Sequence, residues 1–238
     1  MIEVKNLHLK YPNKLILSNL QLQLPAKSWT CILGLTGCGK SSLLKLLAGL
    51  SAHGSYVANV RELAADIAYM PQDDSLLPWL NVLDNVLLGH KLTATVTPFV
   101  LETAKATIAK AGLAEHIYSL PHKLSGGMKQ RVALVRTVMQ NKKVVLMDEP
   151  FSALDVATRH AMQELAFKLL ADKTVLLVTH DVVEALRLGS QVLFLNNPHT
   201  LTPLPMPTAP PLRSIYDAEL LHCQQQIWQQ LQGATAYA

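Results

Sequence analysis

The sequence predicts an α/β fold, built on a buried parallel sheet and interrupted by a helical insert, and two observations carry this prediction. Half of the 238 residues are hydrophobic and 16% are charged, a balance that suits parallel strands buried on both faces. Short apolar, β-branched segments alternate with helix-forming segments, but the stretch from Leu80 to about Met139 is helical in character throughout. The alternation is typical of βαβ units, and the helical stretch indicates an insertion into them.

The individual elements follow from this pattern in chain order. The expected strands, of which the first is an edge strand and the last closes the sheet, are residues 2–9, 20–24, 29–33, 66–70, 144–147, 174–178 and 191–195. The expected helices are residues 42–48, 81–90, 98–111, 126–140, 155–171 and 215–231, with a short turn at 113–118. Residues 198–211 hold six of the 13 prolines, which predicts a stiff extended connector. We expect the helix beyond the connector to pack against the core.

Composition and charge argue against several classes of protein. The net charge is +4 with scattered basic residues, which is a weak signal for nucleic-acid binding. No apolar run approaches the ~18 residues of a membrane span, and residues 1–6 lack the apolar core of a signal peptide. Cys31, Cys38 and Cys223 form neither a disulfide framework nor a zinc pattern. We therefore expect a soluble protein of a reducing compartment, with no nucleic-acid partner.

Residues 34–41 carry the most specific motif of the chain, the pattern G-x-x-x-x-G-K-[ST] placed between a strand and a helix. Its glycines let the backbone wrap around phosphate oxygens, and the helix N-terminus adds aligned N–H groups. The lysine can reach the β- and γ-phosphates, and the serine hydroxyl can ligate Mg²⁺. The sequence therefore predicts that a nucleoside triphosphate is bound by Gly34, Leu35, Thr36, Gly37, Cys38, Gly39, Lys40, Ser41 and Ser42.

Two further motifs agree with this site. Asp148 and Glu149 end the apolar strand 144–147. In phosphate-loop enzymes the first acid of such a pair holds Mg²⁺, and the second can act as the base that polarises the attacking water. A second glycine pair, in residues 125–127, opens a second helix and makes another anion site by the same helix-end physics. Two such sites in one chain indicate that two copies share nucleotides.

With these motifs the chain resembles the nucleotide-binding subunit of an ABC transporter, over nearly all of residues 1–196. The family's other motifs occur here in the family order: an adenine-stacking aromatic (Tyr11), a Q-loop glutamine (Gln72), a signature loop (Ser125, Gly126, Gly127), a D-loop (152–155) and a switch histidine (His180). The resemblance implies a P-loop NTPase (RecA-like) core with a parallel sheet, a small antiparallel β lobe and an inserted α-helical subdomain. The implied domains are 1–200, with core 1–75 and 140–200 and helical subdomain 77–138, and a Pro-rich connector with C-terminal helix, 201–238.

The resemblance also implies what each residue does. ATP would lie between two head-to-tail copies of the chain, with Gly34 to Ser42 of one copy facing Ser125 to Gly127 of the other. We expect this dimer to contain two identical copies, and a related chain as partner is left open. The implied catalytic residues are Glu149, His180 and Gln72; the implied Mg²⁺ ligands are Ser41, Gln72 and Asp148; Tyr11 and Asp155 complete the nucleotide contacts. Asp155 is also a plausible N-cap of its helix.

Residues 76–86 give a closer resemblance, to the importers that serve nitrate, aliphatic sulfonates, taurine and thiamine precursors. It implies an ATPase at the cytoplasmic face of a bacterial inner membrane, which powers solute uptake through a membrane permease supplied by a solute-binding protein. Leu76, Leu77, Pro78 and Trp79 are expected to contact that permease, because apolar loop residues are costly to expose. Packing of Trp79 inside the helical subdomain is the alternative.

The alternative function is a soluble ABC ATPase of DNA repair or chromosome organisation. Those proteins split the nucleotide-binding halves with a long coiled coil, whereas this insert is ~60 residues long and has no sustained heptads. The chain departs from the family at Thr36, where Ser is usual, and at Met128, where Gln is usual; we expect activity to persist because the loop backbone and the signature Ser and glycines remain. The segment between Gly49 and Tyr69 is short, which predicts a trimmed β lobe.

Overall fold

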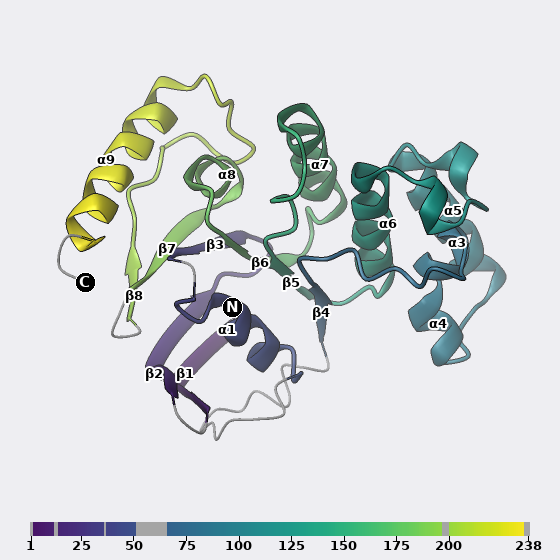
Figure 1. Ribbon diagram of the computed structural model, residues 1–238, viewed down its shortest axis with the longest axis horizontal. Helices are drawn as coiled ribbons and strands as arrows, with labels where there is room; N and C mark the ends of the chain where they lie inside the picture. Colours follow the sequence, from purple (N-terminus) through teal and green to yellow (C-terminus); the bar gives the residue numbers. More distant parts are fainter. Residues whose placement is uncertain (1, 12–13, 36, 51–65, 197–199, 236–238) are drawn as a thin grey trace.

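The computed structural model describes residues 2–11, 14–35, 37–50, 66–196 and 200–235. In these residues a six-stranded sheet has the order β4-β5-β6-β3-β7-β8, shown in Figure 1. The strands are β3 (Trp29–Gly34), β4 (Ile67–Met70), β5 (Val144–Asp148), β6 (Thr174–Thr179), β7 (Gln191–Asn196) and β8 (Thr200–Pro203). The pairs from β4 to β7 are parallel and the pair β7–β8 is antiparallel. The predicted α/β class with a largely parallel sheet is confirmed.

A second, two-stranded antiparallel sheet precedes the main one. It pairs β1 (Ile2–Tyr11) with β2 (Lys14–Leu24). The first predicted strand is therefore present, but it belongs to this small sheet and not to an edge of the main sheet. This sheet is the predicted antiparallel β lobe, which is confirmed. The expected trimming of the lobe falls largely on residues 51–65, outside the described part of the chain.

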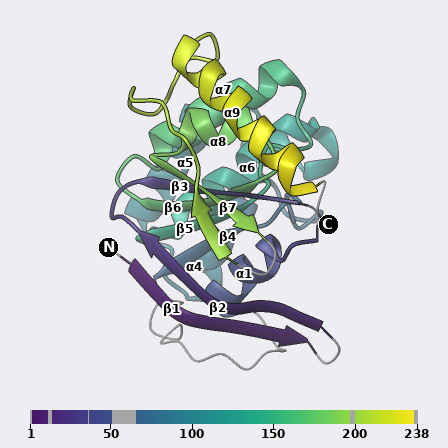
Figure 2. The same cartoon turned by 90° about the vertical axis from the view of Figure 1, so that its left-hand side faces the viewer.

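Two layers cover the main sheet, one on each face (Figure 2). On one face lie α1 (Lys40–Leu47) and the β1–β2 sheet. On the other face lie α7 (Val156–Leu169), α8 (Val182–Leu188) and α9 (Ala218–Thr235). Alternate strand residues supply the two cores: Cys31 and Leu33 pack in the helical one, and Ile32 packs with α1. Strands buried on both faces explain the high hydrophobic and low charged content.

The helical insert forms beside the β4 edge, at the right of Figure 1. It consists of α3 (Val82–Val86), α4 (Leu88–Leu92), α5 (Pro98–Lys110) and α6 (Gly126–Met139), with 3-10 turns at Ala114–His116 and Pro121–Lys123. The side chains of Asn81, Thr97 and Ser125 cap α3, α5 and α6 by accepting backbone N–H bonds. The insert has a hydrophobic core of its own. The single helix expected over 81–90 is two short helices that meet at Leu87.

The C-terminal third differs from expectation in two places. Helix α8 was not predicted, and β7 does not close the sheet, because β8 pairs with it from within the proline-rich segment. The C-terminal helix does pack on the core, as expected, through Leu220, Cys223 and Ile227. No helix in the described residues is long and apolar enough to cross a membrane.

Candidate nucleotide site

The phosphate-loop residues lie at the carboxyl ends of the central strands, where ligands bind in open α/β sheets. Gly34 ends β3 and Lys40 begins α1. Gly37 and Gly39 have φ of 80° and 104°, conformations that favour glycine. A Cβ on Gly39 would also lie 2.7 Å from the Ile16 Cγ2 of β2. The loop between β3 and α1 therefore requires the glycines that the motif places there.

The Lys40 ammonium lies over this loop. Its Nζ donates to the carbonyl oxygens of Gly34 at 2.8 Å and Leu35 at 2.9 Å, and the side chain is buried. Its contacts are backbone carbonyls and the Cys38 sulfur at 4.0 Å. A cation held at the centre of a glycine-rich loop, at the start of a helix, is suited to binding phosphate.

Ser41 and Asp148, far apart in sequence, meet at the same edge of the sheet. The Ser41 hydroxyl donates to Asp148 Oδ1 at 2.9 Å, and the Tyr69 hydroxyl donates to Asp148 Oδ2 at 3.2 Å. Asp148 is 4% exposed. The partial burial of the Tyr69 hydroxyl, and then the neighbouring Asp148 carboxylate, raise the pKa of Tyr69. A hydroxyl and a carboxylate are oxygen ligands of the kind that Mg²⁺ takes. Among the described residues no group of three or more His, Cys, Asp or Glu could hold a metal.

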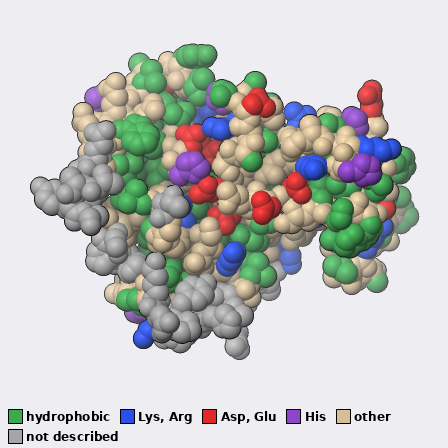
Figure 3. Space-filling model, in the orientation of Figure 1, with side chains coloured by type: hydrophobic (Ala, Val, Ile, Leu, Met, Phe, Trp, Pro, Cys, Tyr) green, Lys and Arg blue, Asp and Glu red, His purple; other side chains and the backbone are tan. Residues whose placement is uncertain are grey.

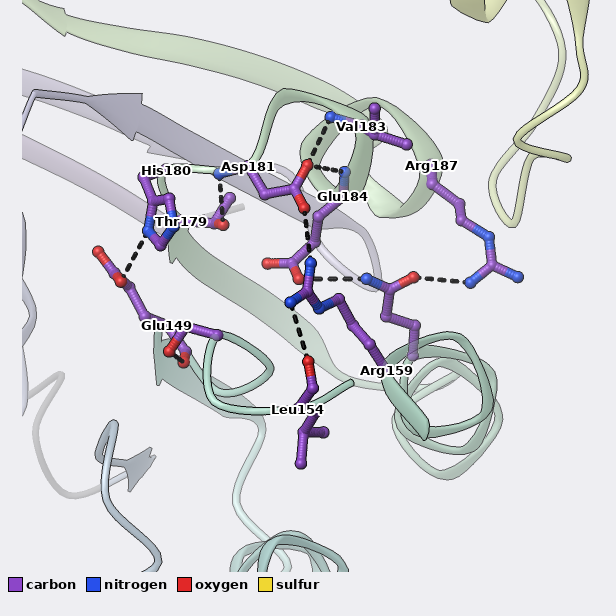
Figure 4. A network of polar contacts seen from close by, with 11 residues as sticks. Glu149, Leu154, Arg159, Thr179, His180, Asp181, Val183, Glu184 and Arg187 are labelled. Atoms are coloured by element: carbon purple, nitrogen blue, oxygen red, sulfur yellow. Dashed lines mark hydrogen bonds and ion pairs between the residues drawn. The ribbon is translucent and has the colours of Figure 1, made fainter. Parts of the chain in front are cut away.

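Glu149 and His180 form the next pair, shown in Figure 4. His180 Nδ1 and Glu149 Oε2 are 2.8 Å apart, with Nδ1 as donor in the tautomer that fits a carboxylate acceptor. His180 follows β6 directly, and β6 runs between β5 and β3. The sheet order thus brings the two predicted catalytic residues together beside the phosphate loop. On the face that Figure 1 presents, charged side chains gather over this region (Figure 3).

Arg159 links the loop that follows Glu149 to the loop of His180. Its Nη2 donates to the Leu154 carbonyl at 2.9 Å, and its Nη1 lies 3.4 Å from Asp181 Oδ2. Asp181 Oδ1 in turn accepts from the backbone N–H groups of Val183 and Glu184 and caps α8. One guanidinium therefore joins the predicted D-loop, residues 152–155, to the segment that carries His180.

Glu184, on α8, is a buried acid behind this network. Its Oε2 accepts from the Gln163 amide at 3.1 Å, and burial raises the pKa of Glu184 to about 7. Since the fold favours the protonated acid, the free energy of unfolding should fall as pH rises from about 4.5 to about 7 and stay lower above.

Replacing Glu184 with Gln should remove this pH dependence. At pH 8 we expect the variant to gain stability, by at most about 3 kcal/mol, while at pH 4.5 the two proteins should be nearly equal. Urea unfolding at both pH values measures the difference. An equal change in the free energy of unfolding at both pH values would show that Glu184 does not titrate in this range.

The other predicted site residues are spread over the surface of one chain. Ser125 and Gly126 are exposed at the start of α6, and α6 and α1 lie on opposite sides of the sheet (Figure 1). Asp155 is exposed and caps α7 by accepting the Thr158 N–H at 3.0 Å, and hydrogen bonds from the Thr158 side chain and then from its backbone N–H lower the pKa of Asp155. Gln72 is exposed two residues beyond β4. The side chain of Tyr11 and the whole of Thr36 lie outside the described residues.

The sequence analysis did not identify Tyr69, Gln130 and Arg159 as site residues. Gln130 donates from α6 to the Pro150 carbonyl at 2.6 Å, beside Glu149. The available signal was weak: Tyr69 is a polar residue in the largely buried strand β4, and Gln130 and Arg159 are polar residues of helices that carry other polar residues as well. Which motif each one contacts depends on tertiary packing.

Comparisons with known proteins agree with this arrangement. A family described as "ABC transporter" matches residues 17–152. An uncharacterized ABC transporter ATP-binding protein of Haemophilus influenzae is 42% identical over 238 residues, which cover 98% of this chain and 99% of the relative.

Two further relatives are named aliphatic sulfonates import ATP-binding proteins. The one from Pseudomonas syringae pv. tomato is 41% identical and is matched over 87% of this chain and 79% of its own. The one from Paraburkholderia xenovorans is 39% identical over 88% of this chain and 62% of its own. α6 begins at the predicted signature loop, residues 125–127, and is called the signature helix below. The matches show that the chain belongs to the ABC transporter family, as its ATP-binding, ATP-hydrolysing subunit.

Proposed function

We propose that two copies of this chain close around two ATP molecules and use their hydrolysis to drive import of a small solute through a membrane permease. The observation that carries the dimer is the position of the signature helix. Ser125 and Gly126 are exposed at the N-terminus of α6, which lies across the sheet from α1. Within one chain this N-terminus is separated from the phosphate loop, so its N–H groups are available to an ATP bound by a second copy.

In this proposal each ATP site is formed by both copies of the chain. Lys40 and the loop N–H groups of one copy bind the phosphates of the ATP, and residues 125–127 of the other copy cover its γ-phosphate. Tyr11 stacks on the adenine and Asp155 contacts the opposite copy. Mg²⁺, when bound, would neutralise phosphate charge from a place beside Ser41 and Asp148, with Gln72 as a further ligand; the Ser41–Asp148 contact of 2.9 Å supports this placement.

Hydrolysis is assigned to Glu149 and His180. Glu149 is the base that takes a proton from the attacking water. The His180 imidazole, 2.8 Å from Glu149 Oε2, fixes the orientation of that carboxyl. His180 is more exposed than Glu149, with side-chain exposures of 60% and 20%. The exposed imidazole could therefore also contact the γ-phosphate of an ATP bound at the phosphate loop of the same copy, since β6 lies beside β3.

The import role rests on the relatives named as aliphatic sulfonates import proteins. By analogy with them, we infer a place at the cytoplasmic face of the inner membrane, a permease as direct partner and a solute-binding protein as indirect partner. The solute class we favour is an organic sulfonate. The DNA-repair alternative is disfavoured because the insert is compact: its longest helix, α6, has 14 residues, and the insert packs around its own core. That core also supports the proposed division into a nucleotide core and a helical subdomain.

A growth test separates these functions. A host strain that lacks this chain should fail to grow on an aliphatic sulfonate as its only sulfur source, and the intact gene should restore growth while a Glu149→Gln copy should not. Growth of the deletion strain at the normal rate would exclude sulfonates as the solute. Sensitivity of the strain to DNA damage, with normal uptake, would favour the alternative.

Trp79 is the residue we expect to contact the permease. It is 70% exposed, so the alternative that it packs inside the helical subdomain is wrong. Hydrophobic side chains reach the surface of the helical part in Figure 3. Asn85 holds the turn that presents Trp79: it accepts from the Leu77 N–H and donates to the carbonyls of Leu77, Leu80 and Asn81.

Replacing Trp79 with Ser should therefore weaken permease binding and abolish uptake while the basal ATPase rate and melting temperature of the purified chain stay near wild type. Co-purification with the permease is the measurement. Tyr216→Ser is the matched control, because Tyr216 is 85% exposed and comes two residues before α9. Figure 1 shows α9 at the end of the molecule opposite the helical insert. Full retention of the Trp79 variant with normal uptake would remove this residue from the interface.

A further inference from the structure

The turn that carries Glu149 has an unusual backbone. Glu149 has φ of 46°, in the left-handed region that a residue with a side chain rarely adopts because it is strained. The surrounding structure holds it there. The Glu149 N–H donates to the Val178 carbonyl of β6 at 2.9 Å, and the Ser152 hydroxyl donates to the Glu149 carbonyl at 3.0 Å.

A side chain of the helical insert binds the next peptide of the turn, Pro150–Phe151. The Gln130 side chain, 8% exposed, extends from α6, and its Nε2 donates to the Pro150 carbonyl at 2.6 Å. Proline has no N–H, so this carbonyl is the one backbone hydrogen-bonding group of Pro150. The bond is buried, so loss of the Gln130 donor would leave the carbonyl without its hydrogen bond away from water, which is unfavourable.

The position of Gln130 on α6 lets this bond connect the signature helix to the turn that carries Glu149. Ser125 and the glycines that we assign to the partner's ATP form the first turn of α6, and Gln130 lies about one turn further along the same helix. If the N-terminus of α6 is displaced and the helix moves as a rigid unit, the Gln130 amide would move with it. The amide would then shift the Pro150 carbonyl that it bonds, in the Pro150–Phe151 peptide one residue beyond Glu149.

We propose that Gln130 is a positioning residue for ATP hydrolysis, which holds the Glu149 turn in its left-handed conformation and couples it to the signature helix. This proposal rests on the role of Glu149 as the base, as assigned above. Gln130 does not touch ATP in this account. It acts through the placement of the Glu149 carboxyl, and a misplacement of about 1 Å at a catalytic group can cost as much as a hundredfold in rate.

Replacing Gln130 with Met tests the proposal, since Met keeps the length of the side chain and lacks the donor. We expect kcat for ATP hydrolysis to fall by about tenfold to a hundredfold, while the affinity for a fluorescent ATP analogue and the ATP-induced dimer stay near wild type. Gln191→Met is the matched control. The Gln191 amide also donates to a backbone carbonyl, that of Gln23 at 3.0 Å. Gln191 begins β7, so it lies at the amino ends of the parallel strands, whereas the site lies at their carboxyl ends.

The double variant Gln130→Met with Glu149→Gln gives a readout that a merely structural role would not produce. If Gln130 acts through Glu149, the double variant should hydrolyse ATP no more slowly than Glu149→Gln alone. A further fall by the full factor of the single variant would place the effect of Gln130 elsewhere and overturn the proposal. An unchanged kcat in Gln130→Met would overturn it as well.

The same set of variants separates failure of this inference from failure of the proposed function. Normal hydrolysis by Glu149→Gln would refute the assignment of Glu149 as the base. An inactive Glu149→Gln together with a normal Gln130→Met would refute only the positioning role of Gln130. Should Gln130→Met not fold, Gln130→Leu repeats the test. Failure of both variants to fold would assign Gln130 to the fold alone, and the proposal would be overturned.

Discussion

Replacing Glu149 with Gln is expected to abolish steady-state ATP hydrolysis, lowering kcat by about 10²- to 10⁴-fold. The amide keeps the shape of the side chain and can still meet His180, which lies 2.8 Å from Oε2, but it cannot accept a proton from water. ATP binding should persist because the phosphate loop is untouched. The bound ATP should then hold two copies together, so size-exclusion chromatography in ATP should show a dimer and the same run without nucleotide a monomer.

Glu115→Gln provides the control for this result. Glu115 is exposed in the 3-10 turn Ala114–His116 of the helical insert, and its replacement makes the same chemical change away from the strand ends. Hydrolysis by this control should equal that of the wild type. A Glu149→Gln protein that hydrolyses ATP at the normal rate, or that stays monomeric in saturating ATP, would contradict the assignment of Glu149 and the ATP-closed dimer respectively.

Replacing Lys40 with Ala should weaken ATP binding by about tenfold to a hundredfold, the loss expected when a charged donor to phosphate is removed. The Lys40 ammonium lies in the loop, with the Gly34 and Leu35 carbonyls 2.8 and 2.9 Å away. An isolated buried phosphate charge without its cation would be poorly solvated. Isothermal titration with ATP measures the affinity, and thermal unfolding without ATP checks that the loop change has not unfolded the chain.

The control for Lys40 lies on the same helix. Lys45→Ala removes an equal charge from an exposed position of α1, and because surface charges are screened by salt, its effect on ATP affinity should be small at physiological ionic strength. Equal affinities for Lys40→Ala and wild type would refute the phosphate-loop assignment.

The residues that meet at the strand ends were the most predictable part of the site. Their place at one site could be predicted from sequence because each lies at or after the end of an expected parallel strand, and parallel strands end at one edge of the sheet. The structure adds the pairs, Ser41 with Asp148 and Glu149 with His180. The order of the strands in the sheet could not be predicted in the same way. Tyr69 contacts Asp148 because β4 pairs with β5, and the order of the segments along the chain does not require that pairing.

The elements that the sequence did not predict, α8 and β8, are short, and β8 also has a composition that is typical of a connector. Helix α8 has seven residues, too few for a helical period to stand out. Strand β8 has four residues and lies in the proline-rich segment, and composition there favours a connector. Gln130 and Arg159 were missed for another reason: each bonds a carbonyl of the turn after β5, and the partner of a buried polar group is set by packing that a single sequence does not reveal.

The two ends of the main sheet have a consequence for how the chain behaves in solution. Its edge strands, β4 and β8, have four residues each. Pro203 ends β8 and has no N–H to offer, and α6 packs beside β4. Short, proline-ended or covered edges resist strand-to-strand aggregation. The main sheet is therefore a poor template for strand addition by another copy, and in the proposed dimer the contacts between copies would come from loops and helix ends instead of strand edges.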